Sequence, residues 1–232
     1  MNNLLEIHGL TKVYDNVTAL SNIDLVLGGG HITGLLGPNG SGKTTLIKII
    51  CGLLQPTQGT VLVDGNPIGV ESKKVISYLP DKTYLNEHMT IRQVIDMFID
   101  FYSDFDPNRA YEMLTNLAIN PDAKMSTLSK GTKEKVQLIL VMSRRAKLYI
   151  LDEPIAGVDP AARDYILRTI ISNYDPSASI LISTHLIADV EPILDEVIFI
   201  QNGFIRLYQP VDAIREKEGK SVDAFFREVY RC

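Results

Sequence analysis

The stretch Gly37-Pro-Asn-Gly-Ser-Gly-Lys-Thr-Thr45 fits the pattern G-x-x-x-x-G-K-[ST]. An apolar run at 32–36 precedes it and predicts a buried strand, and a helix-like segment at 45–53 follows. Strand, glycine loop and helix in this order are the context that the motif requires. A glycine-rich turn before a helix is the plain alternative, but residue usage puts a chance match at roughly one in a hundred. The stretch therefore predicts a nucleoside triphosphate site.

The residue types of this loop explain why it suits phosphate. Glycines let successive backbone N–H groups turn toward phosphate oxygens, where larger side chains would block the approach. The N-terminus of the next helix adds partial positive charge. Lys43 can reach the β- and γ-phosphates, and the Thr44 hydroxyl can ligate Mg²⁺. The candidate binding residues are Gly37, Pro38, Asn39, Gly40, Ser41, Gly42, Lys43, Thr44 and Thr45.

Size and composition narrow the class of protein. The chain has 232 residues, which suits one large domain or a core with a subdomain. Its net charge of −5 and pI near 5.4 give no electrostatic footprint for nucleic acid. No apolar run approaches the roughly 18 residues of a membrane span, and the N-terminus lacks the pattern of a secretory signal. Cys51, among apolar neighbours, is expected to be a buried free thiol, which fits a reducing cytoplasm.

Periodicity predicts the order of the remaining elements. Segments 4–14 and 19–27 alternate with period two and lie before the phosphate loop, so an N-terminal antiparallel β portion is expected. Helical patterns with capping residues then dominate from 81 to about 145, between two β-rich parts. Further predicted strands are 59–65, 75–79, 147–152, 179–185, 196–200 and 204–208, and further helices are 90–105, 106–117, 133–146, 159–172, 211–217 and 221–230.

Two more polar groups follow predicted buried strands. Asp152 and Glu153 end the strand at 148–153, and His185 ends the strand at 179–185. In open parallel sheets, ligands bind at the carboxyl edge of the strands. An acidic turn and a histidine that caps the next helix are the plain alternatives. Beside a phosphate loop, Asp152 becomes a candidate Mg²⁺ ligand, Glu153 a candidate general base and His185 a candidate γ-phosphate contact.

The other aromatic and imidazole side chains are less informative. Tyr14 suits either a half-buried strand position or stacking on a purine, and spacing does not decide between them. His8 and His31 have no partner in the sequence pattern, and we interpret both as surface or structural residues.

Taken in order, these motifs resemble the nucleotide-binding subunit of an ATP-binding cassette (ABC) transporter, over essentially the whole chain. The phosphate loop alone is generic, but its combination with Leu-Ser-x-Gly, Asp-Glu-Pro and Ser-Thr-His is highly specific. The matching parts are Tyr14 (adenine stacking), 37–45 (phosphate loop), 128–132 (the signature, usually Leu-Ser-Gly-Gly-Gln), 148–153 (hydrophobic strand ending in Asp-Glu), 156–159 (the loop that touches the partner subunit, with Asp159) and His185 (switch histidine).

The resemblance implies an α/β fold, a P-loop NTPase (RecA-like) core with an N-terminal antiparallel β portion and an inserted α-helical subdomain. The expected domain is a single ABC ATPase domain over 1–232, with a nucleotide-binding core at 1–80 and 147–232 and a helical subdomain at 81–146. It implies ATP and Mg²⁺ as cofactors, with Thr44, Asp81 and Asp152 as metal ligands. Glu153 would activate water, and His185 would orient Glu153 and the γ-phosphate.

Two positions depart from the family pattern. Asp81 stands where the family usually has Gln, and it is shorter and charged, so it affects the coupling step more than nucleotide binding. In the signature, Lys130 replaces a glycine and Thr132 replaces Gln, while Ser129 and Gly131 remain. Lys130 either adds a cation near the phosphates or points to solvent.

The resemblance also implies partners. Two such subunits assemble head to tail, with ATP between the phosphate loop of one and Ser129, Lys130 and Gly131 of the other. A separate membrane permease is expected, which would place the chain in the cytoplasm at the inner face of the cell membrane. The contact is expected through the helical part and the segment after Asp81, where the exposed apolar candidates are Tyr84, Leu85, His88 and Met89; core packing is the alternative that explains some of them equally well. An exporter of drugs, peptides or lipids is favoured. The alternative is a soluble ABC ATPase that acts on ribosomes or DNA, and no nucleic acid is expected.

Overall fold

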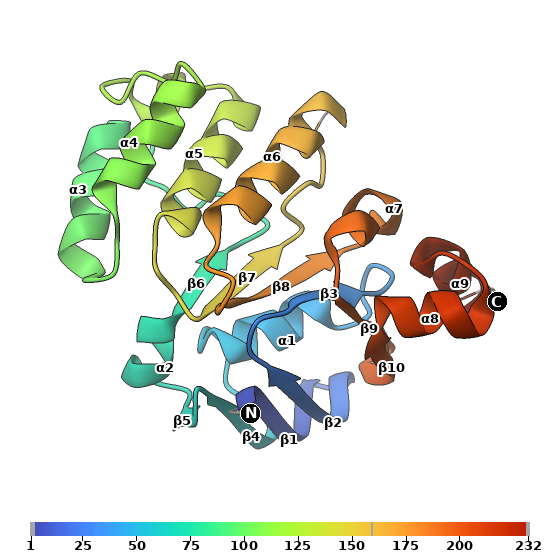
Figure 1. The fold of residues 1–232 in the computed structure, drawn as a ribbon. Coiled ribbons are helices and arrows are strands. Elements are labelled where there is room, and N and C mark those ends of the chain that lie inside the picture. Colours follow the sequence, from blue (N-terminus) through green and yellow to red (C-terminus); the bar gives the residue numbers. More distant parts are fainter. Residues whose placement is uncertain (1–2, 159, 231–232) are drawn as a thin grey trace.

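The computed structural model describes residues 3–158 and 160–230, and its centre is a six-stranded sheet (Figure 1). Strands β3, β7 and β8 are buried along their whole length, as their continuous apolar sequences require in a sheet covered on both faces. The neighbouring strands are parallel except for the β9–β10 hairpin. The spatial order is β10 (Phe204–Pro210), β9 (Glu196–Gln201), β3 (Ile32–Leu36), β8 (Ser179–Thr184), β7 (Leu148–Asp152) and β6 (Ile76–Leu79).

A second, antiparallel sheet is built mostly from the N-terminal part of the chain, as the period-two pattern predicted. Its order is β2 (Val17–Gly28), β1 (Asn3–Tyr14), β4 (Gln58–Val63) and β5 (Asn66–Pro67). Helix α1 (Lys43–Ile50) lies between this sheet and the six-stranded sheet (Figure 1). Its buried side chains, including Leu46 and Ile50, join a core that contains residues of both sheets. This packing fixes the loop that precedes α1.

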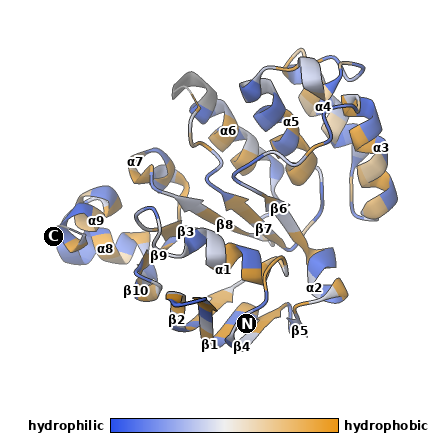
Figure 2. Cartoon of the chain, turned by 180° about the vertical axis from the view of Figure 1, so that it is seen from behind, coloured by the Kyte–Doolittle hydropathy of each residue, from blue (hydrophilic) through white to orange (hydrophobic). Residues whose placement is uncertain are grey.

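The region 81–146 carries helices α3 (Ile91–Phe101), α4 (Pro107–Asn116) and α5 (Lys130–Met142). Each begins after a capping residue, since Thr90, Asp106 and Ser129 accept backbone N–H groups of their helices. Figure 2 shows apolar and polar segments alternating on α3 and α5, as expected for helices that pack on one side.

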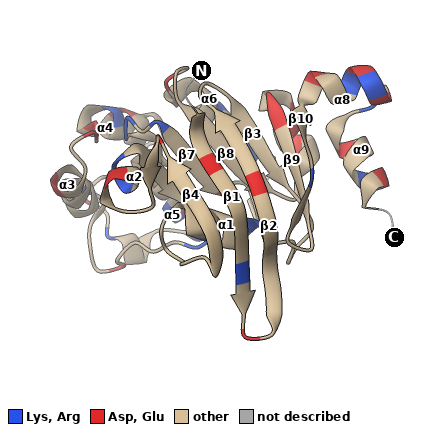
Figure 3. Cartoon of the chain, turned by 90° about the horizontal axis from the view of Figure 1, so that it is seen from below, with Lys and Arg blue, Asp and Glu red and all other residues tan. Residues whose placement is uncertain are grey.

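The remaining helical elements are spread along the chain. They are α2 (Val70–Val75), η1 (Met125–Thr127), α6 (Pro160–Asn173), α7 (Ile187–Val190), η2 (Glu191–Ile193), α8 (Val211–Glu218) and α9 (Val222–Val229). In the view from below, acidic and basic residues are mixed along the chain rather than gathered by sign (Figure 3). Within the described residues, every helix is too short or too polar to cross a membrane.

Several details differ from the sequence predictions, among them the bounds of α5, which runs over Lys130–Met142 rather than 133–146. Helix α2 precedes β6, whereas no helix was expected there; it is only six residues long, too short for a periodic signal. Helix α3 ends at Phe101 rather than at 105. Leu85 is buried at 6% exposure, so its expected role as an exposed contact is wrong; it packs in the core with α3 residues. Tyr84 and His88 are exposed, and Met89 is half-buried.

Candidate active site

The predicted functional segments meet at one edge of the six-stranded sheet. Strands β3, β6, β7 and β8 are parallel, so their carboxyl ends share an edge. The phosphate loop follows β3, Asp81 follows β6, Glu153 follows β7 and His185 follows β8. The topology therefore brings together groups that lie more than 100 residues apart in the chain.

The glycine loop before α1 is held tightly by its neighbours. A side chain at Gly37 would collide with the backbone carbonyl of Ile200 in β9. Gly42 has φ of +112°, a conformation that favours glycine, and a Cβ there would lie 2.8 Å from the carbonyl of Ala19. Because both contacts are with backbone, the loop can carry no larger residue at these positions without a shift of the sheet.

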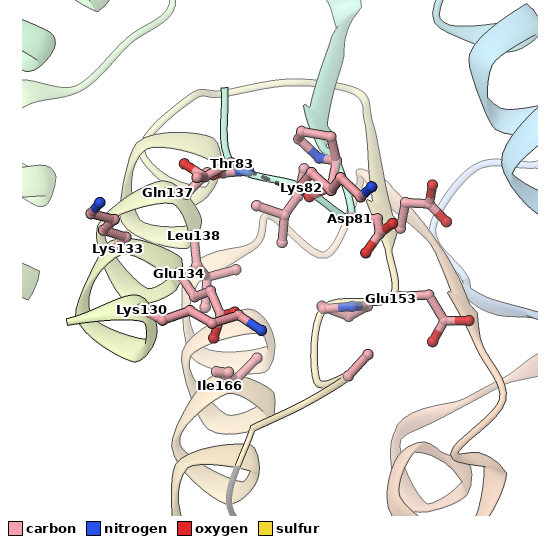
Figure 4. Close-up of a pocket in the computed structure, with 15 residues that line it drawn as sticks. Asp81, Lys82, Thr83, Lys130, Lys133, Glu134, Gln137, Leu138, Glu153 and Ile166 are labelled. Atoms are coloured by element: carbon pink, nitrogen blue, oxygen red, sulfur yellow. Dashed lines mark hydrogen bonds and ion pairs between the residues drawn. The ribbon is translucent and has the colours of Figure 1, made fainter. Parts of the chain in front are cut away.

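A cavity of about 360 Å³ opens over this loop. It is lined by Ala19, Asn39, Gly40, Ser41, Gly42, Lys43, Thr44, Thr45, Asp81, Glu153, Ala156 and His185. A second pocket of about the same volume adjoins it and shares Asp81 and Glu153, and Figure 4 shows its lining. That pocket extends toward α5, from which Lys130, Lys133 and Glu134 line it (Figure 4).

The carboxylate of Glu153 lies between the side chains of Lys43 and His185. Its Oε2 is 3.0 Å from Nδ1 of His185, and its Oε1 is 3.7 Å from Nζ of Lys43. Its own backbone is in the left-handed region, with φ of +52°, an uncommon conformation for glutamate that is found at functional sites. The Glu153 N–H donates to the carbonyl of Ser183 at 3.0 Å, which anchors this turn to β8.

Lys43 is folded back onto its own loop. Its Nζ donates to the carbonyls of Gly37 at 2.8 Å and Pro38 at 3.3 Å. Burial lowers the pKa of the Lys43 ammonium, and the neighbouring carboxylates of Glu153 and Asp152 oppose that shift. The ammonium is thus desolvated and close to the cavity, the state in which a cation attracts an anionic ligand most strongly.

Asp152 is almost fully buried beside the same cavity, with 1% exposure. Its Oδ1 accepts hydrogen bonds from the hydroxyls of Ser183 and Thr44, the latter at 3.4 Å. Its Oδ2 has no hydrogen-bond partner among the described residues, and neither does the buried Oγ of Ser41. Burial raises the pKa of the Asp152 carboxyl. Buried polar atoms without partners are costly, so both atoms indicate a missing ligand.

The predicted signature residues lie at the exposed N-terminus of α5. Ser129 caps the helix, and its Oγ accepts the N–H of Thr132 at 3.2 Å. Lys130 extends into the adjoining pocket, with Nζ 3.8 Å from Oε1 of Glu134 and its side chain 81% exposed. Among the described residues that line the cavity over the phosphate loop, neither Ser129 nor Gly131 appears. The fold of one chain therefore does not bring the signature to its own phosphate loop.

The predicted adenine-stacking residue Tyr14 is not gathered at this cavity. Tyr14, 42% exposed, lies near the β1–β2 turn, and the Nζ of Lys12 is 5.0 Å from its ring centroid. It is not among the described lining residues, so purine stacking stays a prediction. Asp159 lies outside the described residues. His8 and His31 are exposed, in keeping with their interpretation as surface residues.

Sequence reasoning missed two parts of this site. Ser183, whose hydroxyl and carbonyl contact Asp152 and Glu153, lies in a strand buried along its whole length, so no periodicity marked it. Ala19 and Ala156 line the cavity through position alone. A polar residue inside an apolar strand, next to a strand that ends in carboxylates, was the available signal for Ser183.

The fold and the glycine loop define a P-loop NTPase. The family model described as "ABC transporter" matches residues 20–156. The ABC transporter ATP-binding protein YtrB of Bacillus subtilis (strain 168) is 31% identical over 229 residues, covering 97% of this chain and 78% of YtrB. The SkfA peptide export ATP-binding protein SkfE of the same organism is 33% identical over 162 residues, covering 67% and 68%.

The comparison of structures agrees. A solved ATP-binding subunit of an ABC transporter superposes with a TM-score of 0.89 at 29% identity, covering 98% of this chain and all of that one. The chain belongs to the ABC transporter family, as one of its ATP-binding cassettes, and it is an ATPase.

Proposed function

We propose that this chain hydrolyses ATP to power a separate membrane permease, with Glu153 as the base that activates water. The observation that carries this proposal is the position of Glu153, between Lys43 and His185 and beside the buried Asp152. A carboxylate held at the edge of a phosphate-binding cavity can accept a proton from a water molecule that attacks the γ-phosphate.

Lys43 supports the binding of ATP rather than the proton transfer. In the free chain its ammonium is desolvated, hydrogen-bonded to two loop carbonyls and close to Glu153. The β- and γ-phosphates carry more negative charge than these partners, so we expect the ammonium to turn to them. Glu153 then keeps its contact with His185, which orients the carboxylate.

The residues present fit a divalent cation. The unpartnered Oδ2 of Asp152 and the hydroxyl of Thr44 are hard oxygen ligands, and the exposed Asp81 lines the same cavity. We propose that Thr44 and Asp152 hold Mg²⁺, with Asp81 as a third ligand, directly or through water. When bound, Mg²⁺ neutralises part of the charge on the phosphates. Binding of Mg²⁺ would then compensate the cost of burying the Asp152 carboxylate.

The exposed end of α5 supports a head-to-tail dimer. Ser129, Lys130 and Gly131 lie at the N-terminus of a 13-residue helix, where backbone N–H groups and the helix dipole favour an anion. Their own chain places no phosphate loop there. We propose that they contact ATP bound to a second cassette, either a copy of this chain or a different subunit. ATP would then hold the two subunits together, and Asp159 would touch the partner.

We propose that residues 81–146 form a helical subdomain within a single ABC ATPase domain. We propose the permease contact at a pocket of about 470 Å³ that lies beside this subdomain. Leu53 and Tyr84 are exposed at this pocket, at 60% and 53%, and Lys48, Lys73 and Lys82 line it. An apolar pocket lined by lysines suits a partner segment with an apolar anchor and acidic residues.

The name of one relative bears on the class of cargo. SkfE is by its name a peptide export protein, and we propose that this chain likewise serves an exporter of drugs, peptides or lipids at the inner face of the cell membrane. The alternative is a soluble ABC ATPase that acts on ribosomes or DNA. The net charge of −5 favours the permease over nucleic acid.

Glu153→Gln tests the catalytic assignment. The amide keeps the size of the side chain but cannot accept the proton, so ATP binding should persist while turnover falls by about 100-fold or more. Glu71→Gln, which changes a glutamate 63% exposed in a helical ion pair, is the matched control and should turn over normally. Near-normal turnover of Glu153→Gln would remove Glu153 from its role.

A tagged pull-down from detergent-solubilised membranes of the native host tests the partner. Recovery of a multi-span membrane protein in stoichiometric amount supports the permease, and recovery of ribosomal proteins alone supports the soluble ATPase. A Tyr84→Asp variant should lose the membrane protein without losing ATP turnover of the isolated chain, because Tyr84 lines the permease pocket and not the cavity over the phosphate loop.

A further inference from the structure

The turns that carry Glu153 and His185 leave two neighbouring strands. The paired register of β7 and β8 ends at Asp152 and Ser183, and the last backbone hydrogen bond between them runs from Glu153 N–H to Ser183 O at 3.0 Å. Beyond that point β8 is paired only with β3, at Thr184 and Leu36, and among the described residues no backbone hydrogen bond joins the rest of the two turns to each other. Side-chain contacts between the two segments therefore also bear on the contact of 3.0 Å between Glu153 and His185.

Arg163, on the first turn of α6, contacts both segments. Its Nε donates to the carbonyl of Val158, the last described residue of the turn after Glu153, at 3.0 Å. Its Nη1 donates to Oδ2 of Asp189 at 2.9 Å, and Asp189 lies in α7, four residues after His185. Among the described residues, one guanidinium thus bridges the segment of the proposed base and the segment of its histidine partner.

We infer that Arg163 is a positioning residue that sets the separation of Glu153 and His185. This inference rests on the proposed function, in which those two side chains act together. The bridge does not touch the phosphate loop, so it should affect the catalytic step and leave ATP affinity nearly unchanged. Its two acceptors belong to different segments, so loss of either contact frees one segment from the other.

The chemistry of the bridge requires arginine. The guanidinium presents its N–H groups in a rigid planar fork, so its Nε and Nη1 can serve two acceptors in a fixed relation. A lysine ammonium is a single point donor and cannot hold both at these positions.

Because the bridge is partly exposed, we expect it to matter more for the position of the catalytic groups than for the stability of the fold. The side chains of Arg163 and Asp189 are 26% and 38% exposed, and partly solvated ion pairs contribute little to folding. Misplacement of a catalytic group by about 1 Å, by contrast, costs turnover up to about 100-fold. A change at Arg163 should therefore appear in kcat well before it appears in the melting temperature.

The test compares ATP turnover of the full chain carrying Arg163→Gln, Asp189→Ala, or both. We expect Arg163→Gln to lower kcat about tenfold, with KM for ATP within about twofold of the unchanged chain and the melting temperature nearly unchanged. The double variant should be no slower than Arg163→Gln, because both changes break the same bridge. Asp189→Asn keeps an acceptor oxygen and should retain most of the turnover.

Arg145→Gln is the matched control. It breaks another arginine–aspartate pair, at 3.0 Å to Asp106, on the opposite edge of the sheet from the phosphate loop. The inference is overturned if Arg163→Gln keeps kcat within about twofold, if the losses of the two single variants multiply in the double variant, or if Arg145→Gln loses as much turnover.

The two proposals fail in different ways. If Glu153→Gln turns over normally, the proposed function fails and Arg163 has no pair to position. If Glu153→Gln is inactive while Arg163→Gln turns over normally, the proposed function stands and only the bridge is refuted.

Discussion

The Nδ1 of His185 lies 3.0 Å from Oε2 of Glu153, while the other carboxylate oxygen faces Nζ of Lys43 at 3.7 Å. The histidine therefore fixes the carboxylate from the side away from the lysine. If Lys43 leaves for the phosphates, His185 is the partner that remains. This relationship makes the histidine testable separately from the base.

We expect His185→Ala to lower ATP turnover by about 100-fold while ATP binding persists, because Glu153 loses the group that orients it. The measurement is steady-state hydrolysis together with equilibrium binding of a nucleotide. His31→Ala removes another exposed histidine, which lies just before β3, and should turn over normally. Equal turnover of the two variants would contradict the orienting role.

The left-handed backbone conformation of Glu153 predicts a difference in stability between two variants. That difference isolates the cost of the positive φ from the loss of the side-chain contacts. Its φ of +52° costs a residue with a Cβ about 1–2 kcal/mol, whereas glycine adopts it freely. Glu153→Gly and Glu153→Ala both lose the contacts with Lys43 and His185. We therefore expect Glu153→Gly to be the more stable of the two by about 1 kcal/mol, after the greater chain entropy of glycine is allowed for. Urea unfolding checks this, and equal stabilities would show that the turn is unstrained.

Gly37 predicts the cost of a methyl group in the phosphate loop. The Cβ of Gly37→Ala would collide with the backbone carbonyl of Ile200 and approach the buried Oγ of Ser41. Backbone cannot move aside cheaply, so we expect a loss of about 1–3 kcal/mol in the free energy of unfolding, together with weakened ATP binding. Gly28→Ala, where the added Cβ has nothing within 4 Å, is the control and should stay within about 0.5 kcal/mol.

Asp106 predicts a pH dependence of stability. Its hydrogen bond from Arg145 and then the N–H of Arg109 lower the pKa of the Asp106 carboxyl. A carboxyl with a lowered folded-state pKa stabilises the fold above its unfolded pKa of about 3.9, and that contribution is lost as pH falls through the folded pKa. At neutral pH, the protein with the ionised Asp106 should therefore have a higher melting temperature than the Asp106→Asn variant.

Thermal melts between about pH 7 and about pH 2 measure this difference. The difference in melting temperature should shrink only when the pH falls below the ordinary pKa range of an aspartate. High salt should reduce the difference at every pH, because the side chain is partly exposed. A difference that stays constant through the acid range would mean that the charge of Asp106 does not stabilise the fold.

The sequence alone was sufficient for the segments in which chemistry and local backbone conformation coincide. The phosphate loop was predictable because its glycines and Lys43 are required at fixed spacing next to a helix N-terminus. The N-caps Thr90 and Ser129 were predictable because capping depends on a few neighbouring residues. The short helix α2 and the burial of Leu85 were not, because both depend on contacts with distant segments.

The sequence by itself determined the family, the order of the longer strands and helices and the shared edge of the sheet at which Glu153 and His185 lie. Only the tertiary structure decided which atoms meet there: the two partners of Glu153, the unpartnered Oδ2 of Asp152 and the bridge made by Arg163. The physical reason is that the order of strands and helices along the chain follows from local patterns of polarity. Contacts between side chains at the ends of different strands depend on where the turns place them, and no local pattern encodes that.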